Sequence, residues 1–302
     1  MIFSSRRGVT GMFWAFIAIL VWSSSLIMLR SGVNSGLSAY DLTALRYSVA
    51  AILLLPVLFR RGTRANWPGL INTLIMIALF GAPFVMLLSL AVKTAPAAAA
   101  GALNPGVMAI ASVFISRLIY GQKLTRMMLL GIAIAIAGIL GFAWAGGGFA
   151  PGYLVLLATG FMWAGYAAFV RSKAIPAIYA TTFTTVGSAI VYLPVYILAL
   201  PTQIMHVALS DIVIQGIFQG VMVTAIAVYA FSRSVELLGP VAGTSLPALI
   251  PVVTLILAIP LLQEIPQISE VVSACLETIG IALILIKGGV ASSASQKSTT
   301  VH

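Results

Sequence analysis

Residues 11–30 read GMFWAFIAILVWSSSLIMLR, and residues 152–171 read GYLVLLATGFMWAGYAAFVR. A shift of 141 residues lays the first stretch over the second, so that Trp22 meets Trp163 and both stretches begin with glycine and end with arginine. About 20 largely apolar residues are the length that crosses a lipid bilayer as one α-helix. The two stretches therefore predict a membrane-spanning helix that occurs twice in the chain.

A second pair of stretches repeats at almost the same distance. A shift of 142 residues lays AGALNPGVMAIASVF, which begins at Ala100, over AGTSLPALIPVVTLI, which begins at Ala242. Pro105 then meets Pro247, and a glycine lies four residues before each proline. Two shifts that agree within one residue over separate stretches indicate an internal duplication.

Composition extends the membrane assignment to the whole chain. Hydrophobic residues make up 61% of the 302 residues and charged residues only 7%. In a soluble domain about a quarter of the residues are charged, so the surface of this chain must face lipid. Ten stretches have the length and apolarity of a spanning helix. They are residues 11–30, 41–59, 68–92, 97–117, 127–146, 151–170, 178–200, 212–234, 239–262 and 268–287.

The predicted fold class is an all-α integral membrane protein with ten transmembrane helices in two inverted five-helix repeats. The first repeat covers residues 1–146 and the second residues 147–290, while residues 291–302 are small and polar and are expected to form a disordered tail. Because five is an odd number, the two repeats must lie in opposite orientations. Inverted repeats are a recurring architecture of secondary transporters, which bind substrate near the midplane between the halves.

Lysine and arginine predict the orientation. With the amino terminus in the cytoplasm, thirteen basic residues fall in the inner loops and ends, and only Arg30 and Lys93 fall in the outer connections. Both termini are therefore predicted to be cytoplasmic. This asymmetry, together with contact to anionic lipid headgroups, accounts for the net charge of +10 and argues against a nucleic-acid partner.

Four segments together resemble the EamA-type ten-helix members of the drug/metabolite transporter superfamily. They are VWSSS from Val21, GLSAYDLTALRYSVAAILLL from Gly36, LNPGVMAIASVFISRLIYGQKLT from Leu103 and LPALIPVVTLILAIPLLQEIP from Leu246. The resemblance implies a bacterial inner-membrane exporter of small metabolites, commonly amino acids, that uses ion gradients or exchange instead of ATP. One departure is Gln122, where the family usually has the glutamate that Glu264 retains in the second half.

Interruptions and aromatic residues inside the spans are the candidates for a substrate site. Pro105 has no amide hydrogen to bond the carbonyl of Gly101, and a polar substrate or water can bond such a carbonyl in a dry membrane. Flat tryptophan rings near the middle of a span can wall a solute cavity. The alternative is that these residues serve helix packing. The substrate-binding set is Trp22, Ser23, Ser24, Gly101, Asn104, Pro105, Trp163, Tyr166, Gly243, Ser245 and Pro247.

Two charges inside the spans are candidates for ion coupling, because charges in a bilayer are costly and often functional. Glu277 lies about 13 Å into the tenth predicted helix, where it could bind and release a proton during transport. Arg46, in the second helix, could pair with Glu277 or bind an anionic group. The alternatives for Glu277 are a structural ion pair or hydrogen bond, or a different helix boundary. The alternative for Arg46 is extension of its side chain to the outer interface.

Enzyme chemistry has little support in the sequence. The two histidines, His206 and His302, and the single Cys275 form no metal-ligand spacing, and HExxH, GxSxG and nucleotide-binding loops are absent. We therefore expect no metal site, no cofactor and no enzymatic activity. The protein is predicted to be a secondary transporter of a small molecule that is driven by proton coupling or exchange. Its predicted partners are the substrate, the surrounding membrane lipids and, if coupling uses them, protons, and it is expected to act as a monomer or homodimer. The alternative is a membrane sensor or passive channel on the same fold.

Overall fold

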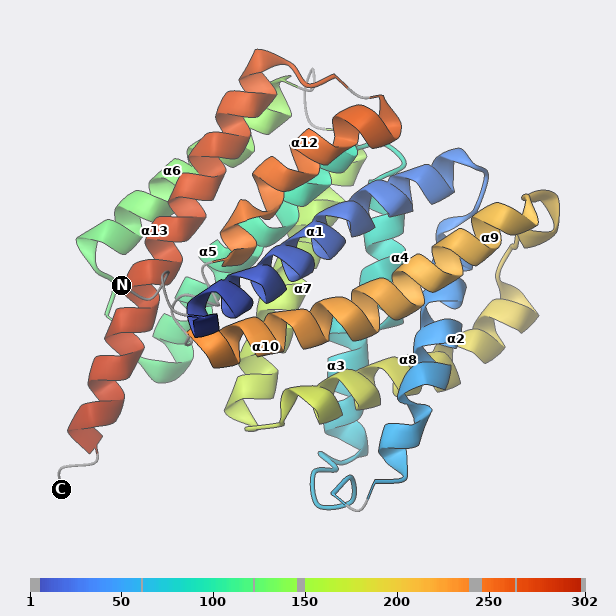
Figure 1. Ribbon diagram of the computed structural model, residues 1–302, viewed down its shortest axis with the longest axis horizontal. Helices are drawn as coiled ribbons and strands as arrows, with labels where there is room; N and C mark the ends of the chain where they lie inside the picture. The colour runs from blue at the N-terminus through green and yellow to red at the C-terminus, as the bar shows by residue number, and fades with distance from the viewer. Residues whose placement is uncertain are drawn as a thin grey trace.

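The computed structural model describes residues 6–60, 62–121, 123–145, 150–238, 246–263 and 265–299, and every regular element in these ranges is a helix (Figure 1). The first half contains α1 (Arg6–Asn34), α2 (Ala39–Leu58), α3 (Leu70–Phe80), α4 (Ala82–Ala91), α5 (Ala97–Tyr120) and α6 (Arg126–Ala145). The second half contains α7 (Pro151–Ser172), α8 (Ala177–Ala199), η2 (Ile204–His206), α9 (Leu209–Gln215), η3 (Gly216–Ala227), α10 (Val228–Leu238), η4 (Leu246–Leu249), α12 (Ile250–Leu262) and α13 (Ile268–Thr299).

Most of the predicted spans are confirmed in length. Within the described ranges, nine helical segments are long and apolar enough to cross a membrane. One of them joins α3 and α4, and another joins α9, η3 and the start of α10. The ninth predicted span, 239–262, is described from Leu246 onward as η4 followed by the shorter apolar helix α12. Pro251 lies in the first turn of α12, where a missing N–H leaves no hydrogen bond unmade.

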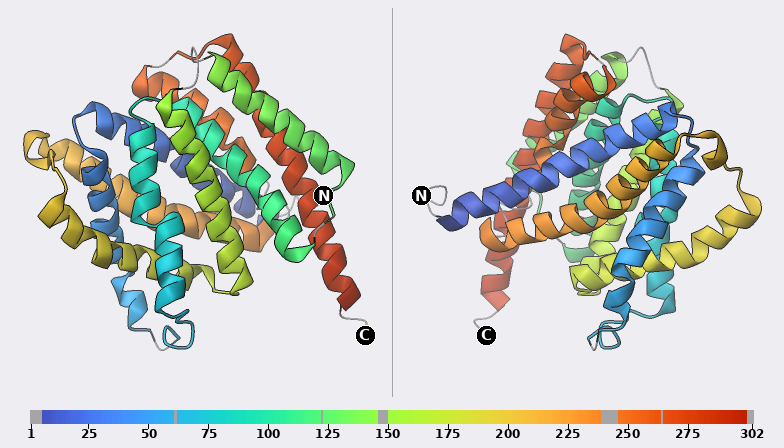
Figure 2. Two further views of the ribbon diagram at one scale, coloured as in Figure 1. Left: turned by 180° about the vertical axis from the view of Figure 1, so that it is seen from behind. Right: turned by 45° about the vertical axis from the view of Figure 1, so that its right-hand side comes forward.

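Contacts between the helices follow a twofold pattern. Helix α1 packs against η3, α10 and α12 of the second repeat, and α7 packs against α3, α4 and α5 of the first. The last helices of the two repeats, α6 and α13, lie side by side along one flank of the molecule (Figures 1 and 2). The first helix of each repeat thus packs across the other repeat, as the predicted inverted architecture requires.

Close packing of α6 against α13 depends on glycine. A Cβ added at Gly131 would lie 2.8 Å from the carbonyl oxygen of Gly280, and one at Gly280 would lie 2.5 Å from the backbone nitrogen of Ala135. Small residues allow helix backbones in a membrane to approach this closely. The GxxxG of Gly216 and Gly220 also serves packing, because a Cβ at Gly220 would lie 2.5 Å from Cβ of Val49 on α2.

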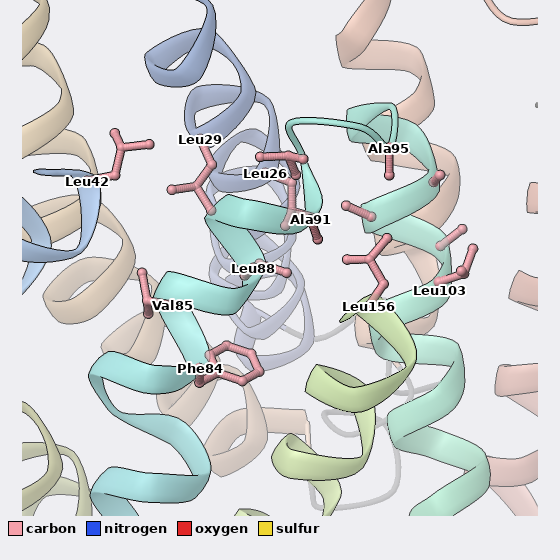
Figure 3. Close-up of a cluster of buried hydrophobic side chains, with 14 of the residues drawn as sticks. Leu26, Leu29, Leu42, Phe84, Val85, Leu88, Ala91, Ala95, Leu103 and Leu156 are labelled. Carbon is pink, nitrogen blue, oxygen red and sulfur yellow. The ribbon is translucent and has the colours of Figure 1, made fainter. Parts of the chain in front are cut away.

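The largest apolar cluster gathers at the end of the bundle where α1 and α4 finish and α2, α5 and α7 begin. Figure 3 shows its side chains converging from these five helices. Leu29, Leu42, Leu103 and Leu156 are at most 1% exposed. This end of the bundle is therefore closed by apolar packing.

Helix α13 is longer than the tenth predicted span. It continues to Thr299, and its last turns extend past the rest of the bundle (Figure 1). It thus includes most of the segment 291–302 for which composition favours disorder. The serine, alanine and lysine residues there contain no proline that would stop a helix once begun. Residues 146–149, which contain the predicted boundary between the repeats, lie outside the described residues.

Candidate functional site

Two spans depart from a regular α-helix at corresponding positions of the repeats, one by a break and the other by a change to π-helical winding. In the first repeat, α3 and α4 are separated at Gly81, where a Cβ would lie 2.5 Å from the carbonyl oxygen of Ile77. A shift of 141 residues takes Gly81 to Met222, inside the π-helical segment η3. A glycine-interrupted span in an inverted repeat is a pointer to a binding site, and π-helical segments occur frequently at functional sites.

Side chains of neighbouring helices form hydrogen bonds with the backbone groups on either side of the break at Gly81. The Ser188 hydroxyl on α8 accepts a hydrogen bond of 3.2 Å from the amide of Ala82. The Tyr47 hydroxyl on α2 donates to the carbonyl oxygen of Phe80 over 3.3 Å. The Phe80 ring stacks on Tyr166 of α7 at 4.7 Å between centroids and on Trp163 at 5.8 Å. An aromatic wall from α2, α3 and α7 therefore lies beside the break.

A polar side chain, Gln219, lies in the π-helical segment η3. Gln219 in η3 is fully buried and donates through Nε2 to the carbonyl oxygen of Ser25 over 3.1 Å. Its Oε1 accepts hydrogen bonds from the Ser25 hydroxyl at 3.2 Å and from Arg46 Nη1 at 3.4 Å. Helix α1 thus fixes the glutamine so that its oxygen faces the arginine.

The aromatic and polar groups adjoin through neighbouring residues of α2. Tyr47 lies within electrostatic range of both Arg46 and Tyr166. We call the combined set the central cluster: Ser25, Arg46, Tyr47, Phe80, Trp163, Tyr166 and Gln219. Its members come from α1, α2 and α3 of the first repeat and from α7 and η3 of the second. Guanidinium and phenol donors beside flat aromatic faces suit a small solute that carries an anionic or polar group.

Arg46 is a cation without an acidic partner. It lies about 10 Å along α2 from Ala39, is half-buried, and contacts the neutral amide of Gln219. No aspartate or glutamate of the described residues pairs with it. The predicted pairing of Arg46 with Glu277 is wrong, because the guanidinium turns toward η3 while Glu277 is enclosed by α5 and α6.

Two of the predicted site residues on α1, Trp22 and Ser23, contact helices of the second repeat away from the break at Gly81. The Trp22 ring packs at 5.2 Å from Phe231 of α10. The Ser23 hydroxyl is fully buried and donates to the carbonyl oxygen of Ile250 over 3.5 Å, and Ser24 is half-buried. Trp22 and Trp163, which are equivalent in the duplication, therefore each pack on an aromatic ring from the third span of the other repeat.

The predicted residues on α5 connect it to α7 and α12. Asn104 donates through Nδ2 to the Thr159 hydroxyl over 2.7 Å. A Cβ at Gly101 would lie 2.6 Å from Cβ of Thr254 on α12. Pro105 is buried inside α5. Gly243 and Ser245 lie outside the described residues, while Pro247 belongs to η4 and its side chain is not described.

Three members of the central cluster, Tyr47, Phe80 and Gln219, are not predicted from the sequence, and Ser25 is noted there only as part of the polar run beside Trp22. One signal was available in the eighth predicted span, where Gln215 and Gln219 are polar and four residues apart. Such spacing places both side chains on one helix face. Gln215 indeed donates to the carbonyl oxygen of Met28 over 2.6 Å, so this face packs against α1.

Comparisons with known proteins agree with this architecture. The model of the EamA-like transporter family matches the chain twice, over residues 9–144 and 150–286. A solved structure described only as "Crystal structure of protein" is 22% identical, with a TM-score of 0.64 over 93% of this chain and 98% of that chain. No curated protein sequence matches the chain. The solved structure shows the fold alone.

Proposed function

This chain belongs to the EamA-like transporter family, and from that premise we propose that it exports small metabolites such as amino acids by alternating access. It is a multi-pass membrane protein of a transporter family and not of an enzyme family. We propose the bacterial inner membrane as its location, with both termini in the cytoplasm and proton coupling or exchange as the driving force. Lipids surround it, it acts as a monomer or homodimer, and no nucleic acid takes part.

One observation carries the proposal. The central cluster draws its members from both repeats and lies at the break between α3 and α4 and at the π-helical segment η3, which occupies the equivalent position in the second repeat. A site between inverted repeats can open to either side when one repeat rocks against the other. Broken helices leave backbone groups that need partners, and such groups are tolerated at membrane depth where they are buried or face a cavity.

The apolar cluster of Figure 3 supports a conformation that is closed toward the outside. With cytoplasmic termini, the end where α1 finishes and α2 begins is the outer end. The same end is bound together by Asp41, which accepts hydrogen bonds from Tyr196 of α8 and from the following loop. An exporter in this state would accept substrate from the cytoplasm.

The substrate is a small molecule with a carboxylate, which Arg46 binds. The half-buried guanidinium of Arg46 carries five donor hydrogens, and within the described residues it contacts the amide oxygen of Gln219. A carboxylate would form charge-assisted hydrogen bonds with it while its organic part lies on Phe80, Trp163 and Tyr166. A zwitterionic amino acid meets both demands.

Counterflow in liposomes tests the proposal. Purified protein is reconstituted, and exchange of each of a panel of amino acids is compared with exchange of its amide, which has the same side chain without the carboxylate. The amino acids should exchange with saturation and the amides should not. Arg46→Gln should raise the half-saturating concentration of the acids about tenfold or more, because it removes a charge-assisted hydrogen bond. Arg117→Gln, at the exposed end of α5, is the matched control.

The outcomes separate the functions. Saturable exchange of acids supports a carrier, whereas flux that does not saturate indicates a passive channel. Binding without flux indicates a membrane sensor. Equal exchange of acids and amides would leave the carrier intact and remove the role of Arg46.

A further inference from the structure

The side chain of Glu277 on α13 lies in an enclosed space against α5 and α6, which we call the socket. Its side chain is fully buried, and neither carboxyl oxygen has a hydrogen-bond partner within the described residues. A Cβ at Gly106 of α5 would overlap Oε1. A Cβ at Gly138 of α6 would lie 2.9 Å from Cβ of Glu277 and 2.8 Å from its backbone nitrogen. The two glycines therefore provide the space in which the side chain lies.

Within the part of the chain that the structure describes, no charged side chain reaches this socket from the helices packed against α13. Helix α6 carries only Arg126, twelve residues or about 18 Å from Gly138, and the side chain is exposed. Helix α5 carries Arg117, which is exposed and eleven residues from Gly106, and Tyr120 beyond it; α12 and η4 carry no titratable group. On α13 itself, Glu270 lies two turns from Glu277 and Cys275 is exposed, while Lys287 and Lys297 lie ten and twenty residues further along the helix.

A carboxyl in such a socket fits in its neutral form. An ionised carboxylate at membrane depth, without a counter-ion or hydrogen bond, costs several kcal/mol. Loss of the proton therefore favours an arrangement in which Glu277 leaves the socket or water enters it. Either change separates α13 from the glycines of α5 and α6, so the protonation state is linked to helix packing.

We infer that Glu277 is a proton-binding site that is separate from the substrate site and acts on it through α5. This inference rests on the proposed transport function and deepens it. Proton release loosens α5 from α13, and proton binding restores the packing. The central cluster itself contains no carboxyl group, so the proton and the substrate occupy different places in the protein.

Helix α5 provides the physical connection. Gly106, which contacts Glu277, follows Pro105 and Asn104 directly. Asn104 bonds to Thr159 of α7 over 2.7 Å, and Trp163 of the central cluster lies four residues further along the same face of α7. Gly160 adds to this contact, because a Cβ there would lie 2.6 Å from Cβ of Val107 on α5. A shift of α5 therefore moves the aromatic wall of the site.

Infrared spectroscopy of the reconstituted protein, without substrate, tests proton binding directly. The unmodified protein should show a buried neutral carboxyl band that is lost as the pH rises. Glu277→Gln should remove the band, while Glu270→Gln, an equal change on the same helix, should retain it. Glu277→Asp keeps a carboxyl group and should retain a titrating band at a shifted pH. An unchanged band in Glu277→Gln, or a Glu277 band that persists at every pH at which the protein is folded, would overturn the inference.

Transport measurements test the coupling. Counterflow requires no net proton movement, so Glu277→Gln should retain it, because the substrate site is elsewhere. A gradient of one pH unit can drive about tenfold accumulation if one proton moves per substrate, and Glu277→Gln should lose this accumulation while Glu270→Gln retains it. Accumulation by Glu277→Gln equal to that of the unmodified protein would refute the coupling. Absence of counterflow in the unmodified protein would refute the transport function, and the infrared result would still decide the proton site.

Discussion

Asp41 is a fully buried carboxylate at the start of α2, and all of its partners are donors. Oδ2 accepts hydrogen bonds from the amide and hydroxyl of Ser38, at 2.9 and 2.7 Å, and from the amide of Gln203 at 3.0 Å. Oδ1 accepts from Tyr196 at 2.6 Å and Thr202 at 2.7 Å. One side chain thus caps α2 and ties it to the end of α8.

Replacement of Asp41 by asparagine should destabilise the protein. The amide nitrogen would face donors, and each hydrogen bond to a charged group contributes about 1.5–3 kcal/mol. We expect a clear fall in the Tm of the purified protein in detergent. Asp211→Asn is the control, since Asp211 is partly exposed in the first turn of α9. Equal Tm values for the two variants would contradict the role of Asp41.

Among the described residues, the third and eighth spans depart from a regular α-helix at equivalent positions, the third by a break at Gly81 and the eighth by π-helical winding. Gly81 allows α3 and α4 to meet at an angle that brings Phe80 to Tyr47 and Ala82 to Ser188. In the equivalent span of the second repeat, η3 winds more widely and places Gln219 against α1. The two elements therefore bring the members of the central cluster to one place.

Gly81→Ala should impair both stability and transport. The added Cβ would meet the carbonyl oxygen and Cα of Ile77 at 2.5 and 2.8 Å, and overpacking of this kind costs about 1–3 kcal/mol. A lower Tm and slower counterflow are expected. Gly165→Ala is the matched control, because its Cβ would meet Leu79 at an ordinary 3.6 Å. If both variants behave like the unmodified protein, the break at Gly81 does not need glycine.

At the scale of the whole molecule, the two repeats are held together by reciprocal contacts. Helices α1 and α7 each pack on the opposite repeat, α2 packs on α8, and α6 packs on α13. The inner and outer ends can then exchange roles as the structure rocks, which alternating access requires.

Thiol labelling of whole cells checks the orientation. In a Cys275→Ser background, which removes the only cysteine, Met205→Cys and Ala65→Cys each introduce one exposed thiol. A membrane-impermeant maleimide added to intact cells should label position 205 and reach position 65 only after the cells are opened. The reverse pattern would invert the proposed orientation and place the apolar cluster at the cytoplasmic end.

Sequence reasoning located part of the candidate site. Arg46, Trp163 and Tyr166 were selected as charged or aromatic residues inside spans, and all three belong to the central cluster. Trp22 was selected on the same grounds and packs against Phe231 instead. Trp22 and Trp163 have similar positions within their spans, so the local sequence does not separate them. Only their neighbours on other helices show that Trp163 lines the candidate site while Trp22 packs between helices. Tyr47 could not be predicted as a site residue, because its partner is the backbone carbonyl of Phe80 and every residue has such a group.

The sequence by itself determined the spans and the duplication, because both are linear properties. Apolar length decides whether a helix can cross a bilayer, and a constant shift reveals a repeat. Only the tertiary structure decided which polar groups meet, because those contacts join distant residues: Arg46 and Gln219 are 173 positions apart. It also decided that Glu277 faces glycines and not an arginine. The partner of a buried charge depends on which helix faces pack together, and no local pattern in this chain specifies that.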